Sequence, residues 1–511
     1  MAGRGARNEA SERVPLVNDD DDGDVGQPCR ECPPEDQESI ASTVSEVVES
    51  VGMGRFQVAL FCAMGLSWMA ESAKFGAVAL VAPMVACEWN LPAVQESMLT
   101  SFAFIGAAIG CYAFGMVADV LGRKSTYWCV SLLGVIGSLG AAGSPTTEWL
   151  GFCFFLLGLV VGGINVGPVY LIEYMPIAQR GRWGAFLAMP WALGMVGGAG
   201  IAWFAVPWAG WRAYLAMLNI PYVGVFALLP FFPESAHFLV VAGKPLKAMA
   251  ALKRMAKINR VKLGSTVVLL AEEGGESTDD ASLCLLVKQG LGGLARLLSR
   301  TLWWTTLTSV SMAVAEIFTY NSLLLLNTQI HAEAVGTCES RHFRLSEQAY
   351  VDMMIVSSAD VIGNLLGIAM IEWIGRKWSL TTQFIGSAVA LVPLLIAPHI
   401  EPTVFLFMSR AVVLASYSIL VVYIPELYST GVRTQALGLA VLMGSVASLL
   451  TPFVAQGLLQ QHGLRSALGV ICTVLVAGGV SALCSPRETI GEALQDATES
   501  RRKLSWSPIQ D

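Results

Sequence analysis

The hydrophobic residues of this chain are concentrated in long apolar stretches and do not alternate with polar residues as in amphipathic helices or strands. A helix needs about 20 consecutive apolar residues to cross a hydrocarbon core of about 30 Å with its backbone groups bonded within the segment. Stretches of this kind predict twelve spanning helices, at residues 56–85, 97–117, 125–143, 148–172, 183–206, 211–232, 301–328, 348–371, 378–397, 403–425, 434–457 and 465–484. We therefore expect an all-α membrane protein.

The composition supports this interpretation, because 54% of the 511 residues are hydrophobic and only 14% are charged. Residues 1–54 differ from the rest. Asp19 to Asp22 form an acidic run among Ser, Glu, Pro and Gly residues, and such a segment buries too little apolar surface to fold. We expect a disordered tail without a cleavable signal peptide, so the first spanning helix should remain as the insertion signal.

Basic residues gather at one end of the predicted helices. That end carries Arg123, Lys124, Arg180, Arg182, Arg376, Lys377 and Arg433, whereas the other end has only Arg212, Arg341, Arg344 and Arg465. The positive-inside rule puts the first set, and with it both termini, in the cytosol. The sequence leaves open whether the membrane is the plasma membrane or that of a vesicle or vacuole.

The chain divides into two bundles of six helices, at residues 55–233 and 301–485. A cytosolic linker at 234–300, with short helices and ten Lys or Arg residues, separates them, and a cytosolic tail follows at 486–511. Four charged pairs recur at one offset of 253 residues: Asp119 with Glu372, Arg123 with Arg376, Glu173 with Glu426, and Arg180 with Arg433. This predicts two pseudo-symmetric parallel repeats.

The repeated charges have two interpretations. They can simply anchor helix ends at the interface, or they can form ion pairs that hold one side of the protein closed and then release it. Small residues such as Gly115 would let a neighbouring helix approach closely. The predicted cytoplasmic gate consists of Gly115, Asp119, Gly122, Arg123, Lys124, Glu173, Arg180, Glu234, Glu372, Arg376, Glu426 and Arg433.

Several of these motifs resemble those of a known superfamily. Gly-x-x-x-Asp-x-x-Gly-Arg-Lys at 115–124 is similar to the signature between helices 2 and 3 of major facilitator transporters. Pro233-Glu234-Ser235 resembles a motif of sugar porters and organic ion transporters, with His237 in place of the usual arginine. The resemblance implies a fold of two six-helix bundles and transport by alternating access.

Further segments resemble the synaptic-vesicle-glycoprotein-related and organic ion transporter branch of that superfamily. They are 54–57 (Gly-Arg-Phe-Gln), 68–71 (Trp-Met-Ala-Glu), 423–428 and 450–456. The resemblance runs from about residue 54 to residue 495. Members of this branch carry organic cations, anions or vitamins, so it does not fix the substrate.

The chain departs from that branch at several positions. Phe154 stands where an arginine is usual in helix 4, and Ser445 where many relatives have a charged residue in helix 11. Lys74 follows Glu71 by one turn, where relatives tend to have a second acid. Substrate charge therefore cannot be taken over from the relatives.

Charges in the middle of a spanning helix cost at least about 2.5–3.5 kcal/mol, so they should face a cavity or a partner. This chain has five: Glu71, Lys74, Glu316, Asp360 and Arg410. In transporters of this kind helices 1 and 7 line the central cavity, which implies that Glu71 and Glu316 face it. Alternatively, Glu71 and Lys74 neutralise each other on one helix face, and Arg410 serves packing or gating. Glu316 has no basic neighbour on its own helix, which favours a ligand or proton site.

Aromatic and amide side chains complete the predicted substrate or proton site. Aromatic faces hold cations or stack on rings, although Trp and Tyr in membrane helices also serve as interface anchors. The candidates besides the five charges are Asn165, Tyr170, Trp191, Tyr320, Asn321, Tyr417 and Gln456.

The sequence offers no sign of an enzyme, cofactor or metal site. It lacks the Gly-x-x-x-x-Gly-Lys-Ser/Thr loop that binds ATP phosphates, and its five histidines have no metal-ligand spacing. Cys29 and Cys32 have a CxxC spacing but no second pair. The cysteines are mostly apolar packers, and a disulfide between Cys87 and Cys338 is conceivable.

We therefore expect a secondary active or facilitative transporter of a small organic solute, such as an organic ion or a vitamin. It should be monomeric, lie in a lipid bilayer and have no nucleic-acid partner, and proton coupling is left open. The alternative is a receptor or scaffold that keeps the fold without carrying a solute.

Overall fold

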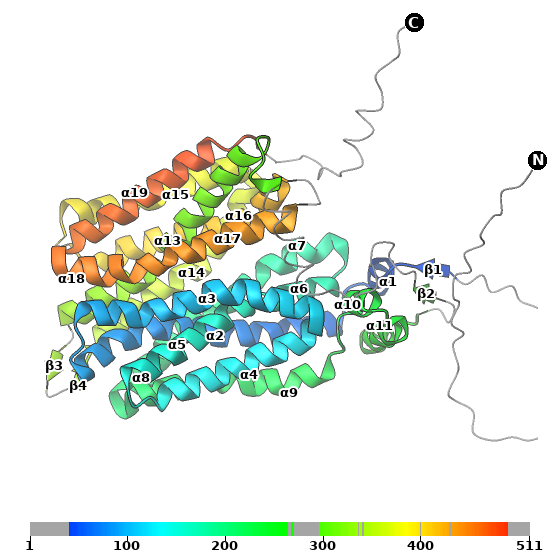
Figure 1. The fold of residues 1–511 in the computed structure, drawn as a ribbon, viewed down its shortest axis with the longest axis horizontal. Helices are drawn as coiled ribbons and strands as arrows, with labels where there is room; N and C mark the ends of the chain where they lie inside the picture. Colours follow the sequence, from blue (N-terminus) through cyan, green and yellow to red (C-terminus); the bar gives the residue numbers. More distant parts are fainter. Residues whose placement is uncertain are drawn as a thin grey trace, which may run out of the picture.

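A computed structural model of the chain describes residues 40–263, 267–269, 296–335, 337–339, 342–398, 400–428 and 432–488. Almost every element is a helix (Figure 1). In chain order the elements are β1 (Ile40–Ser42), α1 (Val44–Val51), α2 (Arg55–Trp89), α3 (Ala93–Leu121), α4 (Arg123–Ala142), α5 (Thr147–Gly163), α6 (Val166–Glu173), α7 (Ile177–Phe186), α8 (Ala188–Met217), α9 (Ile220–Leu228), η1 (Leu229–Phe231), α10 (Ala236–Val241), α11 (Pro245–Asn259), β2 (Val267–Leu269), α13 (Trp303–Val335), β3 (Thr337–Glu339), β4 (His342–Arg344), α14 (Glu347–Trp373), α15 (Arg376–Ile396), α16 (Pro402–Glu426), α17 (Arg433–Ala447), η3 (Ser448–Leu450), η4 (Phe453–Leu458), α18 (Leu459–His462) and α19 (Leu464–Leu483).

The described chain has 11 helical stretches that are long and apolar enough to cross a membrane. One of them, Ala188–Phe231, has 44 residues. At about 1.5 Å per residue it would be roughly twice as long as the hydrocarbon core is thick. Its backbone leaves the helical region at Gly210, where φ is 74° and ψ is 177°, and the chain reverses there. This stretch therefore supplies two crossings, and the prediction of an all-α protein with twelve spanning helices is confirmed.

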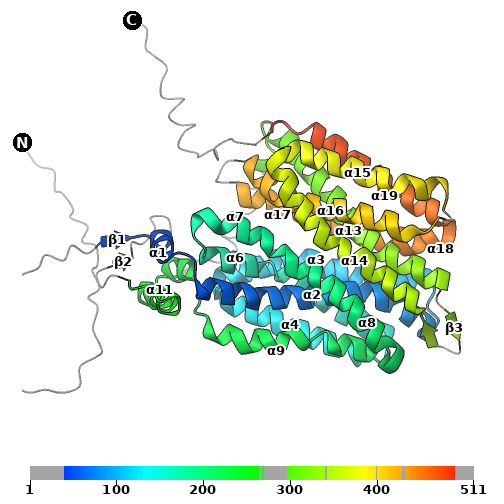
Figure 2. The ribbon, with the colours of Figure 1, turned by 180° about the vertical axis from the view of Figure 1, so that it is seen from behind.

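The spanning helices form two lobes that lie side by side with their axes roughly parallel (Figures 1 and 2). The first lobe contains α2 to α9 and the second contains α13 to α19. The lobes meet chiefly where α8 contacts α14 and where α3 contacts α17, while α2 and α13 face each other at the centre. The end of the lobes that carries Arg123 and Arg376 is called the charged end below.

Helices α3 and α5 pack more closely than side chains normally allow. A Cβ atom on Gly158 would lie 1.9 Å from the carbonyl oxygen of Ala103, and one on Gly106 would lie 2.1 Å from that of Phe155. Glycine is required where two membrane helices approach this closely. Gly115, which was predicted to allow such an approach, has no atom within 4 Å of a built Cβ, so that part of the prediction is wrong.

The expectation of a disordered tail up to residue 54 is also wrong for its last part. Residues 44–51 form helix α1, which a capping box of Thr43 and Glu46 starts. Valines at positions 44, 47, 48 and 51 share one face and are buried, because that face packs on α11. Residues 1–39 lie outside the described part.

Two short strand pairs flank the bundle at opposite ends. β1 pairs in parallel with β2, so that Ile40 lies opposite Val267, beyond the charged end (Figure 1). β3 and β4 form an antiparallel pair near the other end. Cys87 on α2 is disulfide-bonded. The side chain of Cys338, its predicted partner, lies outside the described residues.

Replacing Gly158 with alanine should destabilise the first lobe, because the new methyl group collides with the Ala103 carbonyl. Overpacking of this kind costs about 1–3 kcal/mol. Thermal unfolding in detergent should show a clear fall in the midpoint. Gly197→Ala is the matched control, because a Cβ there meets no atom within 4 Å; an equal fall in both variants would contradict this account of α3–α5 packing.

Candidate functional site

A cavity of about 170 Å³ lies between the two lobes, near the middle of the spanning helices. Both lobes contribute to its wall. The lining residues are Trp68, Phe75, Phe104, Ala107, Cys111, Val161, Gly162, Ile164, Asn165, Ala188 and Trp191 from the first lobe, and Glu316, Ile317, Tyr320, Asn321, Asn364, Leu414, Tyr417, Val441, Ser445 and Ser448 from the second. Its position resembles that of a transport site at the interface of two repeats.

Glu316 is the one acidic side chain in this wall. It lies on α13 and is 2% exposed. Its Oε2 atom is buried without a hydrogen-bond partner, and no ion pair reaches it from the described residues. A carboxyl group held in this way has unused capacity to bind a cation or a proton.

The rest of the wall is aromatic, amide or aliphatic. Trp191 contacts Trp68 at a centroid distance of 6.0 Å and Phe75 at 6.2 Å, so three aromatic rings of the first lobe meet at the cavity. On the opposite wall the Asn321 amide donates to the Ser448 hydroxyl at 3.0 Å. The cavity thus combines flat apolar faces with a few polar groups, as small-molecule sites do.

Half of the predicted site residues line this cavity, and half do not. Those in the wall are Asn165, Trp191, Glu316, Tyr320, Asn321 and Tyr417. Those outside it are Glu71, Lys74, Tyr170, Asp360, Arg410 and Gln456, each of which has partners elsewhere, described below.

Asp360 and Arg410 form a buried ion pair behind the cavity wall. Arg410 Nε lies 2.7 Å from Asp360 Oδ1, and its Nη2 lies 2.9 Å from Oδ2, with both side chains fully buried. The Tyr320 hydroxyl donates to Asp360 Oδ2 at 3.0 Å and accepts from Trp191 Nε1 at 3.1 Å. A chain of hydrogen bonds therefore links the first lobe, the cavity wall and the buried pair.

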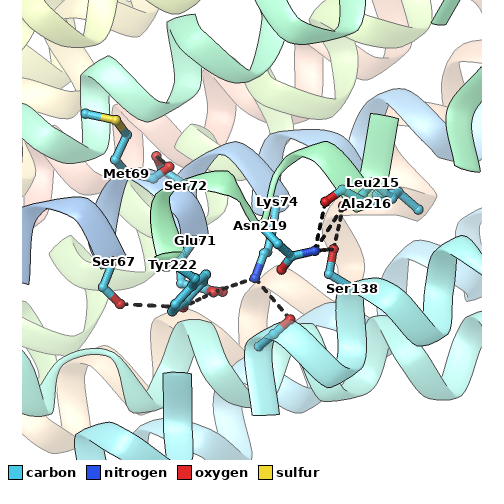
Figure 3. Close-up of polar contacts among 11 residues, drawn as sticks. Ser67, Met69, Glu71, Ser72, Lys74, Ser138, Leu215, Ala216, Asn219 and Tyr222 are labelled. Atoms are coloured by element: carbon cyan, nitrogen blue, oxygen red, sulfur yellow. Dashed lines mark hydrogen bonds and ion pairs between the residues drawn. The ribbon is translucent and has the colours of Figure 1, made fainter. Parts of the chain in front are cut away.

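Glu71 and Lys74 form the second buried pair, inside the first lobe (Figure 3). Lys74 Nζ lies 3.1 Å from Glu71 Oε1 and donates to the Gly134 carbonyl at 3.0 Å. The Tyr222 hydroxyl also donates to Glu71 Oε1, and its ring lies 4.3 Å from Lys74 Nζ. The expectation that Glu71 faces the central cavity is wrong in this structure, since α4 and α9 enclose it.

The remaining two residues have structural contacts. Tyr170 is buried and donates to the Pro233 carbonyl at the charged end. Gln456 lies at the other end, where its Oε1 accepts from Thr100 at 3.0 Å and its Nε2 donates to Glu96 at 3.4 Å. Together with the bond from Ser97 to the Pro452 carbonyl, these contacts join α3 to the second lobe at that end.

The ion pairs of the predicted gate lie within lobes. In the first lobe Arg123 Nη1 contacts Asp119 at 2.6 Å and its Nε contacts Glu173 at 3.3 Å. In the second lobe Arg376 Nε lies 3.4 Å from Glu426. Arg180 and Arg433 bond backbone carbonyls, of Met175 and Pro425, and the Glu372 side chain lies outside the described residues.

Glu234 holds the start of α4, beside the ion pairs of Arg123. It accepts hydrogen bonds from the backbone N–H groups of Lys124 and Ser125, while Lys124 Nζ donates to the Phe232 carbonyl. A Cβ on Gly122, whose φ is 96°, would lie 2.6 Å from Glu234. Only glycine therefore fits at this turn.

The second lobe repeats this arrangement with a residue that the sequence analysis missed. Glu488 accepts from the backbone N–H groups of Arg376 and Lys377 at 2.8 and 3.0 Å, and Lys377 Nζ donates to the Ser485 carbonyl at 2.8 Å. Phe232 and Ser485, like Lys124 and Lys377, are 253 residues apart. The same offset takes Pro233 to Pro486 but Glu234 to Arg487. Glu488, which has the same contacts as Glu234, lies one residue further on, so a constant offset does not find it.

Of the three aromatic rings that the first lobe brings together at the cavity, Trp191 was predicted, whereas Trp68 and Phe75 were missed. Trp68 and Phe75 are seven residues apart and so lie on the same face of α2. Phe104, Ala107 and Cys111 follow a similar spacing on α3. This spacing can be read from the sequence. In a membrane helix, however, the spacing alone does not show whether a face lines a cavity or packs against another helix.

Comparisons with known proteins agree with this geometry. The model of the family described as sugar (and other) transporter matches residues 63–500. This chain belongs to that family. The organic cation/carnitine transporter 7 of Arabidopsis thaliana is 30% identical over 491 residues, which cover 90% of this chain and 97% of the relative. The synaptic vesicle 2-related protein of Xenopus laevis is 30% identical over 89% of this chain and 82% of its own length.

Solved structures show the same fold. The inward-open xylose transporter XylE from E. coli superposes with a TM-score of 0.62 at 17% identity, covering 88% of this chain and 99% of the transporter. The partially occluded inward-open form gives 0.60. The resemblance to major facilitator transporters, and to their synaptic-vesicle-related and organic ion branch, is thereby confirmed. The protein is a multi-pass membrane transporter of small solutes, not an enzyme.

Removing one charge of the Glu71–Lys74 pair should be more harmful than removing both. Glu71→Gln leaves the Lys74 ammonium buried and uncompensated, which costs about 3–5 kcal/mol. The double variant Glu71→Gln, Lys74→Met should recover much of the lost thermal stability and folded yield. Equal stability of the single and double variants, measured by thermal unfolding in detergent, would show that the pair does not hold the first lobe together.

Proposed function

We propose that the protein carries a small organic cation by alternating access, with Glu316 as the anionic group that binds it in the central cavity. The observation that carries this proposal is the charge balance of the spanning helices. Lys74 is paired with Glu71, and Arg410 with Asp360. Glu316 remains as a carboxyl group without a basic partner among the described residues, at the wall of the cavity.

The aromatic wall supports a cation rather than an anion. The negative faces of Trp, Tyr and Phe rings attract organic ammonium groups. Trp68, Trp191, Tyr320 and Tyr417 surround the same space as Glu316. An anionic solute would instead meet an uncompensated carboxylate, which disfavours its binding.

The contacts between the lobes support an inward-facing state. Hydrogen bonds donated by Ser97 and Thr100, and one that Glu96 accepts from Gln456, join α3 to the second lobe at the end opposite the charged end. At the charged end, the ion pairs of Arg123 and Arg376 stay within their own lobes. If the charged end is cytosolic, as the positive-inside rule indicates, the outer side is closed.

The same charge balance suggests exchange with protons. A bare carboxylate at mid-membrane is costly, so Glu316 should be neutralised in each half of the cycle. An organic cation neutralises it on one crossing, and a proton can do so on the return. Solute and proton would then compete for one group, and a proton gradient would drive accumulation.

Glu316→Gln should reduce uptake of an organic cation into proteoliposomes by about tenfold or more, because hydrogen bonds to charged groups contribute about 1.5–3 kcal/mol. Radiolabelled tetraethylammonium and choline are suitable probes. Glu148→Gln, at an exposed acid on α5, is the matched control and should transport normally. Binding of the probe by the unmodified protein without accumulation would contradict transport and favour a receptor.

A pH gradient should distinguish exchange from facilitated diffusion. Proteoliposomes with an acidic lumen should accumulate the cation above its external concentration, and a protonophore should abolish the accumulation. In Glu316→Gln any residual uptake should be independent of the gradient. If the unmodified protein equilibrates the cation at the same rate with and without the gradient, proton exchange is refuted while cation transport still stands.

A further inference from the structure

Helix α11 carries an exposed basic face that the transport cycle described above does not use. Between residues 244 and 262 there are seven Lys or Arg residues and no Asp or Glu. All seven side chains are exposed: Lys244, Lys247, Lys253, Arg254, Lys257, Arg260 and Lys262. We call this set the α11 basic face.

The other face of α11 is occupied. Ala248, Leu252 and Met255 are buried in the cluster that also holds the valines of α1. The apolar side therefore fixes the helix on the first lobe, and the cations project away from that packing.

Carboxylates nearby in the described chain are engaged elsewhere. Glu46 of α1 accepts from the Thr43 backbone, and Glu49 accepts from the Ile177 backbone at 2.9 Å. Glu234 binds the backbone of Lys124 and Ser125. No ion pair within the described residues reaches the α11 basic face, and Arg254 lies close enough to Lys124 for the two cations to repel each other.

We propose that the acidic segment at residues 19–38 of the same chain binds the α11 basic face. This segment has nine Asp or Glu residues and one arginine, so its net charge of −8 matches the seven cations of the face. Blocks of like charge of this kind are typical of interaction tails.

The connection between the two segments supports this pairing. Ile40, two residues after the acidic segment ends, lies opposite Val267 in the β1–β2 pair. Val267 follows Lys262 by five residues. The acidic segment therefore enters the structure beside the carboxyl-terminal end of the basic face.

The lengths also agree. Twenty residues can reach at most about 70 Å, and the 15 residues of α11 extend about 22 Å, so the segment is long enough to cover the face. Only Ser39 separates the segment from Ile40 in β1, and so short a tether gives an effective concentration at the face of the order of millimolar. A free anionic partner would have to compete with that concentration.

Binding at this face would act on the transport machinery through α11 and α10. Asn259 at the end of α11 accepts from the Phe56 backbone at 2.9 Å and donates to Gln57 at 2.8 Å, which holds the start of α2. Phe238 on α10 lies 5.9 Å from the Arg123 guanidinium. The bound segment would thus stiffen the cytosol-side end of the first lobe, and salt would weaken it by screening.

Lysine acetylation of the full chain in phosphatidylcholine nanodiscs tests this proposal. At low salt the amines of Lys247, Lys253 and Lys257 should react about threefold more slowly in the unmodified protein than in a variant with Asp19, Asp20, Asp21 and Asp22 changed to Asn. A zero-length carbodiimide should link the acidic segment to these lysines, and about 0.5 M salt should remove both effects.

The control neutralises the same number of acids at the opposite end, at Glu148, Glu347, Asp352 and Glu401, and should leave the acetylation rates unchanged. Equal lysine reactivity in the unmodified and tail variants, with no cross-link, overturns the proposal. It is also overturned if protection appears only when phosphatidylserine is added and persists in the tail variant, because the face then binds the membrane instead.

Discussion

An unpaired charge in a low-dielectric interior is energetically costly, and this constraint determines how the charged residues of the spanning helices are arranged. Of the five charges that the spanning helices carry near mid-membrane, four form two buried pairs, and each pair stays within one lobe. A pair that does not cross the lobe interface need not break when the lobes move. Glu316 alone lies at the interface without a basic partner among the described residues. In the proposed function, a mobile cation or proton binds to this carboxyl group.

The duplication of the chain explains how the surrounding frame is built. Each lobe contains a lysine, an arginine and a glutamate in equivalent positions. The glutamate, Glu234 in the first lobe and Glu488 in the second, follows the last helix of its lobe and accepts from backbone N–H groups at the start of α4 or α15. These contacts hold helix ends rigidly within a lobe. Hydrogen bonds from Trp191 to Tyr320 and from Thr100 to Gln456 cross between lobes instead, and such neutral bonds cost less to exchange than ion pairs when the lobes rock.

The sequence predicted the fold well and the site only in part. Apolar length determines spanning helices directly, because lipid leaves the backbone no other partner, and the offset of 253 residues located the repeats. Orientation about a helix axis is harder to predict. Glu71 lies only one turn from Trp68, yet it turns toward α4 and α9 while Trp68 lines the cavity. A membrane helix is apolar all round, so its pattern does not separate these faces. Helix α1 was missed because its four valines are buried against α11, a segment far away along the chain.

The central claim is that Glu316 is the carboxyl group that binds the cation or proton. The most direct test is to identify the residue that a hydrophobic carbodiimide labels. Such reagents modify carboxyl groups that are protonated in apolar surroundings. Mass spectrometry of the labelled chain should place the adduct on Glu316, and bound tetraethylammonium should protect it. Glu71 and Asp360 should stay unmodified, because buried ion pairs with Lys74 and Arg410 occupy their carboxyl groups. Labelling of Glu71 or Asp360 in preference to Glu316, or labelling of Glu316 that no organic cation reduces, would contradict the account.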